Sequence, residues 1–576
     1  MAGSTETDWV SRFADDVIAE SERRAPGKTV VVASGLSPSG PIHLGNLREV
    51  MTPHLVADEI RRRGHEVRHL ISWDDYDRYR KVPNGVAGVD PSWAEHIGKP
   101  LTSVPAPAGS PYPNWAEHFK AQMAASLAAL GVAYDPISQT AQYTSGAYRE
   151  QILHAMRHRA DIDAILAQYR TKKAPAKQNQ QNKPLDEAEI AAAEGSGAAA
   201  EDDGSGSGSA YYPYKPYCVE CGKDFTTVTA YDDKTTELTY TCTCGAGETV
   251  RLSEFNRGKL VWKVDWPMRW AYEGVVFEPS GVDHSSPGSS FQVGGQIVGP
   301  IFGGEQPIGP MYAFVGISGM AKMSSSKGGV PVPEDALRIM EPQLLRWLYA
   351  RRRPNQSFKI AFDQEIQRLY DEWDALTRKV EDGTVLPADA AAYSRAVGTA
   401  AGELPRTPRP MPYRTLASVA DITAGAQAQT LRILSELDPE RPLASLDEVR
   451  PRLDRAEAWI TTQVPAEQRT VVRAEPDTER LAALDDSDRG ALKLLADGLA
   501  SHWSLDGLTT LVYAVPKIQA GLAPDAKPTP ELKVAQRSFF ALLYELLVGR
   551  DTGPRLPTLL LAVGQDRVRT LLGFGG

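Results

Sequence analysis

Two short segments constrain the fold of this chain more than any other feature. The first is Pro38-Ser39-Gly40-Pro41-Ile42-His43-Leu44-Gly45-Asn46, which follows an apolar run at 29–33 and precedes a stretch with helical spacing. This order predicts a strand, a small-residue loop and a helix whose N-terminus faces a phosphate. The second is Lys322-Met323-Ser324-Ser325-Ser326-Lys327-Gly328, in which two lysines flank serines. Lysines on such a backbone suit a polyphosphate, so the pair predicts ATP chemistry.

Each segment taken alone has a plainer interpretation. A histidine before a helix is commonly a capping or packed residue, as could hold for His43. A stretch rich in lysine and serine is commonly a solvated loop. The order of the two segments within one chain favours the nucleotide-binding interpretation.

Length and charge bound the class of protein. A chain of 576 residues is too long for one compact core and predicts three or four domains. A net charge of −10 argues against nonspecific coating of nucleic acid such as DNA, but it leaves room for a tRNA partner at local basic patches. Residues 1–24 are acidic without an apolar core, and no apolar run approaches about 18 residues. We expect a cytoplasmic protein without membrane contact.

The four cysteines form two close pairs, Cys218 with Cys221 and Cys242 with Cys244. Disulfides are disfavoured in cytosolic proteins, and two such pairs around a polar, hairpin-like stretch suit a four-thiolate zinc site. A glycine follows the second cysteine of each pair and lets the backbone turn back toward the sulfurs. The sequence therefore predicts a structural Zn²⁺ without an open coordination position. Buried free thiols and disulfides are the alternatives.

Pattern changes along the chain predict its organisation. Strand and helix patterns alternate up to about residue 170, which predicts a parallel sheet with helices on its faces. The next stretch, rich in Lys, Gln, Ala, Gly and Ser, cannot bury a core, so we expect disorder there. The expected parts are 1–170 as the first half of an α/β catalytic domain, 171–210 as a low-complexity insertion, 211–252 as a zinc module, 253–330 as the second catalytic half, 331–400 as a stem-contact region and 401–576 as an all-α helix bundle.

The motifs identify a family. The segments at 34–40, 43–46 and 322–327, together with Trp262-Lys263-Val264-Asp265-Trp266-Pro267-Met268-Arg269-Trp270 and Gly281-Val282-Asp283-His284, resemble those of class I lysyl-tRNA synthetases. The resemblance covers the catalytic half well and the C-terminal helices only in general character. It implies a Rossmann-type catalytic domain split by a zinc-bearing insertion and followed by a helical anticodon-binding domain. It also implies the partners L-lysine, ATP and tRNA(Lys).

The implied reaction is lysine activation followed by transfer to tRNA. Lysine attacks the α-phosphorus of ATP, so catalysis reduces to positioning and charge stabilisation. The expected catalytic residues are His43, Asn46, Lys322 and Lys327, with Asn46 as a hydrogen-bond donor only and the two lysines acting on pyrophosphate with Mg²⁺. The expected ATP-binding residues are Pro38, Ser39, Gly40, His43, Gly45, Asn46, Lys322, Ser324, Ser325 and Lys327. Ser325 stands where the usual signature has a lysine, so either lysine could dominate.

A lysine pocket has to pair an ammonium group. Carboxylates near strand ends are the candidates, namely Asp74, Asp75, Asp77, Asp265 and Asp283, and among them we assign Asp75 and Asp265 to the substrate. Each could instead cap a loop. By resemblance, Gly35, Ser37, Trp262 and His284 line the same pocket, with Trp262 against the methylene stem. Trp266 and Trp270 could equally form a core stripe.

Three other functions fit parts of the sequence. A glutamyl-type synthetase shares both signatures, but its anionic substrate calls for arginines around the pocket. A class I-like ligase for a small amine would lack the long helical C-terminal part. A non-catalytic tRNA-binding paralogue would be expected to have lost His43, Lys322 or Lys327. In the C-terminal part, Trp503, Phe539 and Phe540 are possible stacking residues for RNA bases, with core packing as the alternative.

Overall fold

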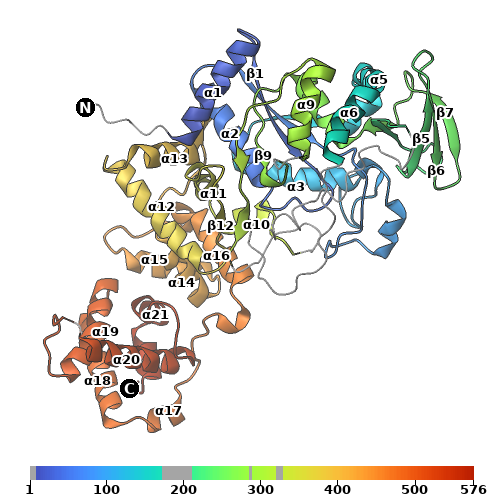
Figure 1. Cartoon of the computed structure of the whole chain (residues 1–576). Helices are drawn as coiled ribbons and strands as arrows, with labels where there is room; N and C mark the ends of the chain where they lie inside the picture. Colours follow the sequence, from blue (N-terminus) through green and yellow to red (C-terminus); the bar gives the residue numbers. More distant parts are fainter. Residues whose placement is uncertain (1–7, 171–209, 285–287, 319–328, 528, 576) are drawn as a thin grey trace, which may run out of the picture. The chain divides into compact units, whose positions relative to one another are not determined.

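The computed structural model describes residues 8–170, 210–284, 288–318, 329–527 and 529–575 (Figure 1). It divides into two compact units. The first unit comprises Met1–Ala336, Pro342–Ile360 and Val380–Leu404, and the second comprises Leu337–Glu341, Ala361–Lys379 and Pro405–Gly576.

The first unit is built on a parallel sheet. Strands β1 (Val30–Leu36), β2 (Val67–Trp73) and β3 (Asp135–Ser138) lie in that order and pair in parallel. Parallel bridges from Val32 to Phe277 and from Phe277 to Ile308 extend the sheet beyond β1. Segments from both sides of the four-cysteine region therefore join one sheet. The mixed α/β fold with a parallel sheet, expected from the alternating pattern, is confirmed.

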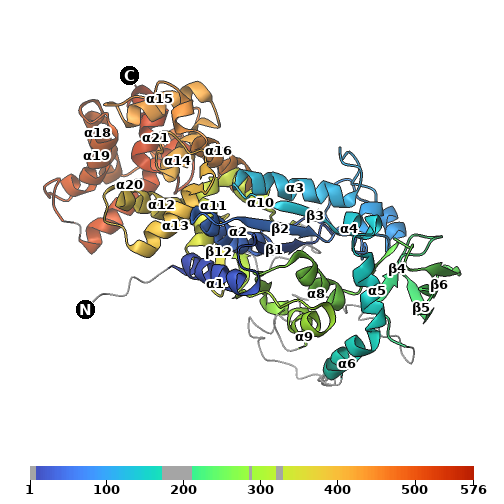
Figure 2. The ribbon, with the colours of Figure 1, turned by 90° about the horizontal axis from the view of Figure 1, so that it is seen from above.

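Helices cover both faces of this sheet (Figure 2). Val31 and Ala33 of β1 pack against helices α8 (Trp262–Glu273) and α9 (Ser290–Phe302). The next residue, Ser34, points to the opposite face and donates to the main chain of α2 (Leu47–Arg62) at Glu49, 3.1 Å away. This alternation follows from the two-residue period of a strand. It buries every residue of β1 except Gly35 and fixes α2 directly behind the first signature.

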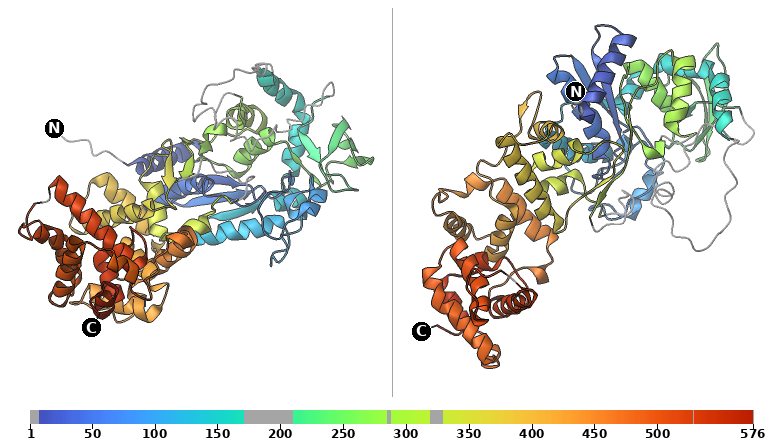
Figure 3. Two further views of the ribbon diagram at one scale, coloured as in Figure 1. Left: turned by 90° about the horizontal axis from the view of Figure 1, so that it is seen from below. Right: turned by 60° about the vertical axis from the view of Figure 1, so that its left-hand side comes forward.

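A second set of strands carries the cysteines. Strands β5 (Thr226–Tyr231), β6 (Glu237–Cys242) and β7 (Gly247–Arg251) form an antiparallel sheet, and β4 (Tyr214–Pro216) pairs with β8 (Gly258–Leu260). Their buried side chains share a core with α5 (Arg149–Arg157) and α6 (Arg159–Arg170), which lie beside this sheet in Figure 3. The other α-helices and strands described outside the helical C-terminal part are α1 (Trp9–Arg24), α3 (Trp115–Ala129), α4 (Gln139–Ser145), β9 (Ser280–Gly281), β10 (Met311–Tyr312), β11 (Val315–Ile317), α10 (Pro333–Ile339), α11 (Pro342–Ala350), β12 (Phe358–Ile360), α12 (Glu365–Glu381), α13 (Pro387–Val397), β13 (Gly398–Thr399) and β14 (Gly402–Glu403).

The second unit is helical in its described part from residue 405 onward. Its α-helices are α14 (Tyr413–Thr423), α15 (Gln427–Leu437), α16 (Arg452–Gln463), α17 (Thr478–Ala482), α18 (Asp486–Gly498), α19 (Leu505–Gln519), α20 (Pro530–Val548), α21 (Leu556–Val563) and α22 (Gln565–Leu571). Phe539 is buried in the core of α18–α22, which removes it as a stacking residue, and Trp503 and Phe540 are partly buried against that core. Tyr513 of α19 is 46% exposed and contacts Phe540 edge to face. Across the described residues, no helix is long and apolar enough to cross a membrane.

Candidate nucleotide and amino acid site

The loop of the first signature connects β1 to α2 at the carboxyl end of the sheet. The main chain turns at 43–46, where the Asn46 amide donates to the carbonyl oxygen of His43 at 2.9 Å. Asn46 occupies the N-cap position of α2, but its side chain makes no capping hydrogen bond. A Cβ added at Gly40 would meet no atom within 4 Å, so the space beside this backbone is open. The loop therefore leaves room and hydrogen-bonding groups for a ligand.

The tautomer of His43 follows from its local contacts. The Gly45 amide donates to Nδ1 of His43 at 3.1 Å, so the ring proton lies on Nε2. Burial lowers the pKa of His43 to about 4. The imidazole is neutral at pH 7, and among the described residues Nε2 has no partner. His43 can thus donate one hydrogen bond to a phosphate or ribose oxygen.

The second signature, with Lys322, Ser324, Ser325 and Lys327, lies outside the described residues. Its flanks are described. On one side, β11 pairs in parallel with β12, and the Ser318 amide continues the ladder to Ile360 at 3.1 Å. On the other side, the carbonyl oxygen of Pro331 accepts from the Leu44 amide at 3.0 Å. The chain thus leaves the second signature at a point bonded to the first.

Asp75 is fully buried and engaged by protein groups. Its carboxylate accepts from the Thr140 amide and the Ser138 hydroxyl, both at 2.7 Å, and from Nζ of Lys120 at 2.9 Å. These contacts anchor the start of helix α4. The structure therefore places Asp75 in a helix-anchoring role and not at an open surface.

Asp265 belongs to a buried group of charges between β2, β8 and α8. It accepts from the Tyr143 hydroxyl at 2.5 Å and from Arg269, which lies one turn further along α8. Lys259 lies 3.9 Å away and pairs with Asp77. Burial acts to raise the pKa of Asp77, but Lys259, with Arg80 and Arg269, acts in the opposite direction and the net shift is downward.

Asp74 differs from these carboxylates because one of its oxygens is not engaged. Its amide donates to the Leu36 carbonyl at 2.9 Å, which places it beside the end of β1. Oδ1 accepts from Arg269 at 2.6 Å, whereas Oδ2 has no hydrogen-bond partner within the described part of the chain. Burial raises the pKa of Asp74 to about 6, and Arg269 opposes the rise. Asp74 thus keeps one carboxylate oxygen unengaged at the position that follows β2.

The tryptophans of α8 form a stacked row. Trp262 stacks on Trp266 at a ring distance of 5.0 Å, and the guanidinium of Arg269 lies 5.4 Å from the Trp262 ring centre. His284 meets Trp266 edge to face at 5.8 Å. Trp266 and Trp270 are buried against the sheet. The structure thus links Trp262 and His284 through Trp266 and Arg269 to Asp74.

The other predicted pocket residues lie at the end of β1. Ser37 is exposed, and a Cβ added at Gly35 would meet the carboxylate of Glu49 at 3.6 Å. Asp283 offers no test, because its side chain lies outside the described part.

Glu278 is a buried group that sequence reasoning missed. It accepts from the indole of Trp266 at 3.1 Å and from that of Trp270 at 2.6 Å. Burial raises its pKa to about 7, although both indoles act in the opposite direction. The sequence-based expectations also omitted Arg269 and Lys259. The four-residue spacing of Asp265 and Arg269 on a helix was a usable signal for Arg269.

The cysteines converge on one point. The Sγ atoms of Cys218, Cys221, Cys242 and Cys244 all lie within 4.8 Å of one another. Cys218 and Cys244 are 3.8 Å apart, and Cys221 and Cys242 are 3.7 Å apart. Four sulfurs at about 2.3 Å from one zinc in a tetrahedron are about 3.8 Å apart, so the donor set fits. The cysteines are free, which removes the disulfide alternative.

Comparison with known proteins gives consistent matches. The sequence profile of the tRNA synthetases class I (K) matches residues 7–401. A lysine–tRNA ligase from Streptomyces coelicolor is 82% identical over 579 aligned residues, which cover 100% of this chain and 99% of that protein. Lysine–tRNA ligases from Thermococcus kodakarensis and Treponema pallidum are 32% and 30% identical, with 99% and 98% of both chains covered.

Among solved structures, a glutamate tRNA ligase from Elizabethkingia meningosepticum aligns over 95% of this chain and 99% of its own, with a TM-score of 0.41 and 12% identity. The profile match and the full-length relatives decide the family: this chain belongs to the class I (K) tRNA synthetases, the class I lysyl-tRNA synthetases.

Proposed function

We propose that this chain is a lysine–tRNA ligase, which activates L-lysine with ATP and transfers the lysyl group to the 3′ end of tRNA(Lys). The observation that carries the proposal is the 82% identity to the Streptomyces coelicolor lysine–tRNA ligase over the whole chain. The geometry agrees, because the first signature lies at the carboxyl end of a parallel sheet, where such folds bind ligands. The glutamyl and non-catalytic alternatives lack comparable support.

In the first step, the lysine carboxylate attacks the α-phosphorus of ATP and pyrophosphate leaves. His43 donates through Nε2 to an oxygen of the phosphate or ribose. The side-chain amide of Asn46 is a second, uncharged donor. Open space beside Gly40 admits the adenosine. Lys322 and Lys327 neutralise the departing pyrophosphate, and Mg²⁺ bound with ATP would supply further positive charge to the same oxygens. The remaining proposed ATP contacts are Pro38, Ser39, Gly45, Ser324 and Ser325.

The lysine pocket is formed where β1, β2 and α8 meet. Asp74, Asp77 and Asp265 carry three negative charges, and Lys259 and Arg269 carry two positive ones. One substrate ammonium would bring this buried group to neutrality. The free oxygen of Asp74 is the acceptor that we assign to it.

The other residues of the proposed pocket line it or hold its binding groups in place. The stem of lysine lies against Trp262, and Gly35, Ser37 and His284 complete the lining. Asp265, which was expected to bind lysine directly, instead holds Arg269 in place for Asp74. Asp75 supports the same region through α4.

The four cysteines hold a structural Zn²⁺ within 211–252. Gly222 and Gly245 adopt left-handed conformations, with φ of 72° and 93°, which turn the backbone back toward the sulfurs. All four protein ligands are thiolates, so the metal would be closed to substrate and would fix the module. The loaded site holds the loops that precede β5 and follow β6.

The helical second unit is the part that we assign to the anticodon of tRNA. Tyr513 is exposed at the contact with Phe540. Lys517 lies one turn from Tyr513 on α19, and Arg537 and Lys533 lie one and two turns before Phe540 on α20. Exposed aromatics beside cations suit the stacking of unpaired bases. The domain ranges and the cytoplasmic location expected from the sequence stay predictions.

Charging of tRNA tests the proposed function directly. The purified chain is incubated with ATP, Mg²⁺, labelled lysine and a tRNA(Lys) transcript, and a second reaction contains labelled glutamate and tRNA(Glu). We expect charging with lysine alone. A protein that binds tRNA(Lys) without charging it would support the non-catalytic alternative.

A further inference from the structure

Helix α2, which follows the first signature, carries a buried arginine that no step above uses. Arg48 is 2% exposed and lies in the first turn of α2. Its Nη1 donates to the carbonyl oxygens of Ala313 at 3.0 Å and Gln356 at 2.8 Å, and its Nη2 donates to that of Arg353 at 2.8 Å. The guanidinium also lies 5.3 Å from the ring centre of Phe358.

The three acceptors belong to the segments that lead into the second signature. Ala313 lies between β10 and β11, and β11 is the last described strand before residue 319. Arg353 and Gln356 form the turn before β12, the parallel partner of β11. The Ala313 amide donates to the Pro354 carbonyl at 2.8 Å, so these segments form one unit. A single guanidinium thus fastens this unit to α2.

The chain that leaves the second signature is fastened to the same place. The Leu44 amide donates to the Pro331 carbonyl at 3.0 Å, and the Tyr349 hydroxyl donates to the Leu44 carbonyl at 3.3 Å. Residues 44–48 therefore hold the described segments on both sides of the second signature.

Stability alone does not favour an arginine at this position. A buried cation loses its hydration, and the N-terminal turn of a helix disfavours positive charge. Burial lowers the pKa of Arg48 to about 10, which still leaves it charged at neutral pH. A planar group with five donors is, however, the side chain that can reach three carbonyl oxygens at once. The geometry therefore points to a role in placement.

We propose that Arg48 is a positioning residue for adenylate formation. It sets the separation between the His43 loop and the strand that leads into the Lys322–Lys327 segment, without contacting a substrate itself. The inference rests on the ATP-binding role proposed above for both signatures. Since phosphate donors from two segments must act on one ATP molecule, a displacement of about 1 Å can cost on the order of 10²-fold in rate.

The test compares Arg48→Met and Arg48→Lys with the wild type in single-turnover adenylate formation, varying ATP and lysine separately. Arg48→Met removes all three hydrogen bonds, so we expect a roughly 30- to 300-fold lower rate and a raised half-saturating ATP concentration. The half-saturating lysine concentration should change by less than about twofold. Arg48→Lys keeps the charge and one contact, and should recover part of the loss.

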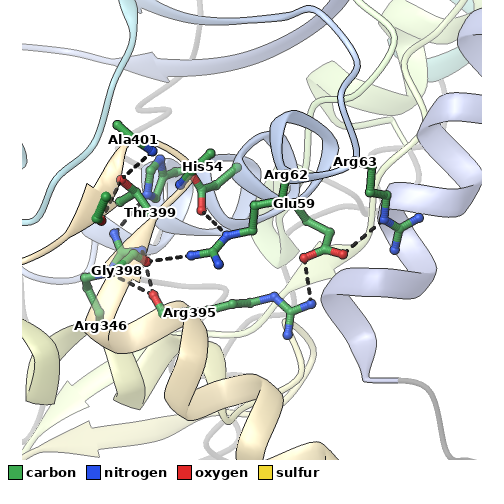
Figure 4. Close-up of polar contacts among 12 residues, drawn as sticks. His54, Glu59, Arg62, Arg63, Arg346, Arg395, Gly398, Thr399 and Ala401 are labelled. Carbon is green, nitrogen blue, oxygen red and sulfur yellow. Dashed lines mark hydrogen bonds and ion pairs between the residues drawn. The ribbon is translucent and has the colours of Figure 1, made fainter.

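Arg346 offers a matched control against the middle of α2, where it contacts His54 (Figure 4). It is fully buried and donates to Nε2 of His54 at 2.9 Å and to the carbonyl oxygens of Leu130, Arg395 and Gly398. It thus stabilises α2 in the same manner as Arg48, but away from the second signature. Arg346→Lys should lower the free energy of unfolding. The half-saturating ATP concentration for adenylate formation by the folded Arg346→Lys protein should remain that of the wild type.

The outcomes are separable. A folded Arg48→Met with wild-type rate and ATP dependence would overturn the proposal, and so would the same ATP shift in the Arg346 variant. If Arg48→Met does not fold, the result for Arg48→Lys decides. A rise in the half-saturating ATP concentration alone supports positioning, and an equal rise in the half-saturating concentrations of ATP and lysine refutes it. A wild-type protein without lysine-dependent adenylate formation would refute the proposed function instead.

Discussion

The main-chain amide of Gly45 donates to Nδ1 of His43 at 3.1 Å and so fixes the tautomer of the signature histidine. Burial lowers the pKa of this ring to about 4, so at neutral pH it is a neutral donor through Nε2 and not an acid. The loop itself supplies this arrangement before any ligand binds. We therefore attribute to His43 the stabilisation of charge on ATP by a hydrogen bond.

His43→Ala should slow adenylate formation by roughly tenfold to a thousandfold, because it removes a donor to the reacting phosphates. His43→Gln retains an uncharged N–H and should be less impaired. Single-turnover formation of lysyl-adenylate measures both effects, and tRNA binding by filter retention serves as the control. A wild-type rate for His43→Ala would remove this residue from the catalytic set.

The buried His69 predicts a pH dependence of stability. Burial lowers its pKa to about 3 from 6.5, and its Nε2 bonds to the Ser34 hydroxyl at 2.9 Å. Between these pH values the unfolded state binds a proton that the folded state does not, so protonation favours unfolding as the pH falls. The free energy of unfolding of the wild type should therefore decrease, relative to His69→Gln, from pH 6.5 downward. Urea unfolding at several pH values gives this difference, and a constant difference would show that His69 is not buried as a neutral ring.

The four cysteines predict one zinc per chain. Cys221→Ser should lose the metal and lower the free energy of unfolding, since zinc binding and folding of the module are linked. Elemental analysis and thermal unfolding measure the two effects, and Lys234→Ala at an exposed position of the same module is the control. Purified wild-type protein that is fully active and stable without metal would contradict a structural zinc.

The carboxylate of Asp74 is expected to bind one of the two ammonium groups of lysine, and substitution of Asp74 shows which one. Asp74→Asn should weaken the binding of lysine by roughly 10- to 100-fold, because it removes a charge-assisted hydrogen bond. Norleucine lacks the side-chain ammonium and 6-aminohexanoate lacks the α-ammonium. The inhibition constant of the analogue that lacks the Asp74-bound ammonium should be unaffected by the substitution.

Inhibition constants for both analogues in wild type and Asp74→Asn therefore identify the paired group. If the substitution weakens the binding of lysine and of both analogues by the same factor, Asp74 acts only by holding Arg269 and binds no ammonium group.

The fold was predictable to a useful extent because its signals are local. The apolar run before the first signature gives β1, and the spacing after it gives α2. The pairing of Phe277 with Val32, in contrast, joins segments on both sides of the low-complexity and cysteine-bearing stretches. No local pattern specifies such a long-range pairing, so the sequence indicated only that strands return after the cysteines.

Side-chain roles at the site were less predictable than its location. Asp74 and Asp75 are neighbours, yet the first keeps one carboxylate oxygen unengaged among the described residues and the second anchors α4, because consecutive residues at a strand end point in different directions. The sequence pattern predicts Asp75 as a substrate-binding residue, although its carboxylate is engaged by the start of α4. Glu278 gave no signal, since its partners Trp266 and Trp270 lie on a helix that reaches it only in the fold.

The central claim is that this chain activates lysine, and ATP–pyrophosphate exchange over all twenty amino acids tests it most directly. We predict exchange that depends on lysine, with glutamate, methionine and arginine near the background without amino acid. Exchange driven by glutamate, or no exchange with any amino acid by folded protein in the presence of Mg²⁺ and tRNA(Lys), would contradict the account.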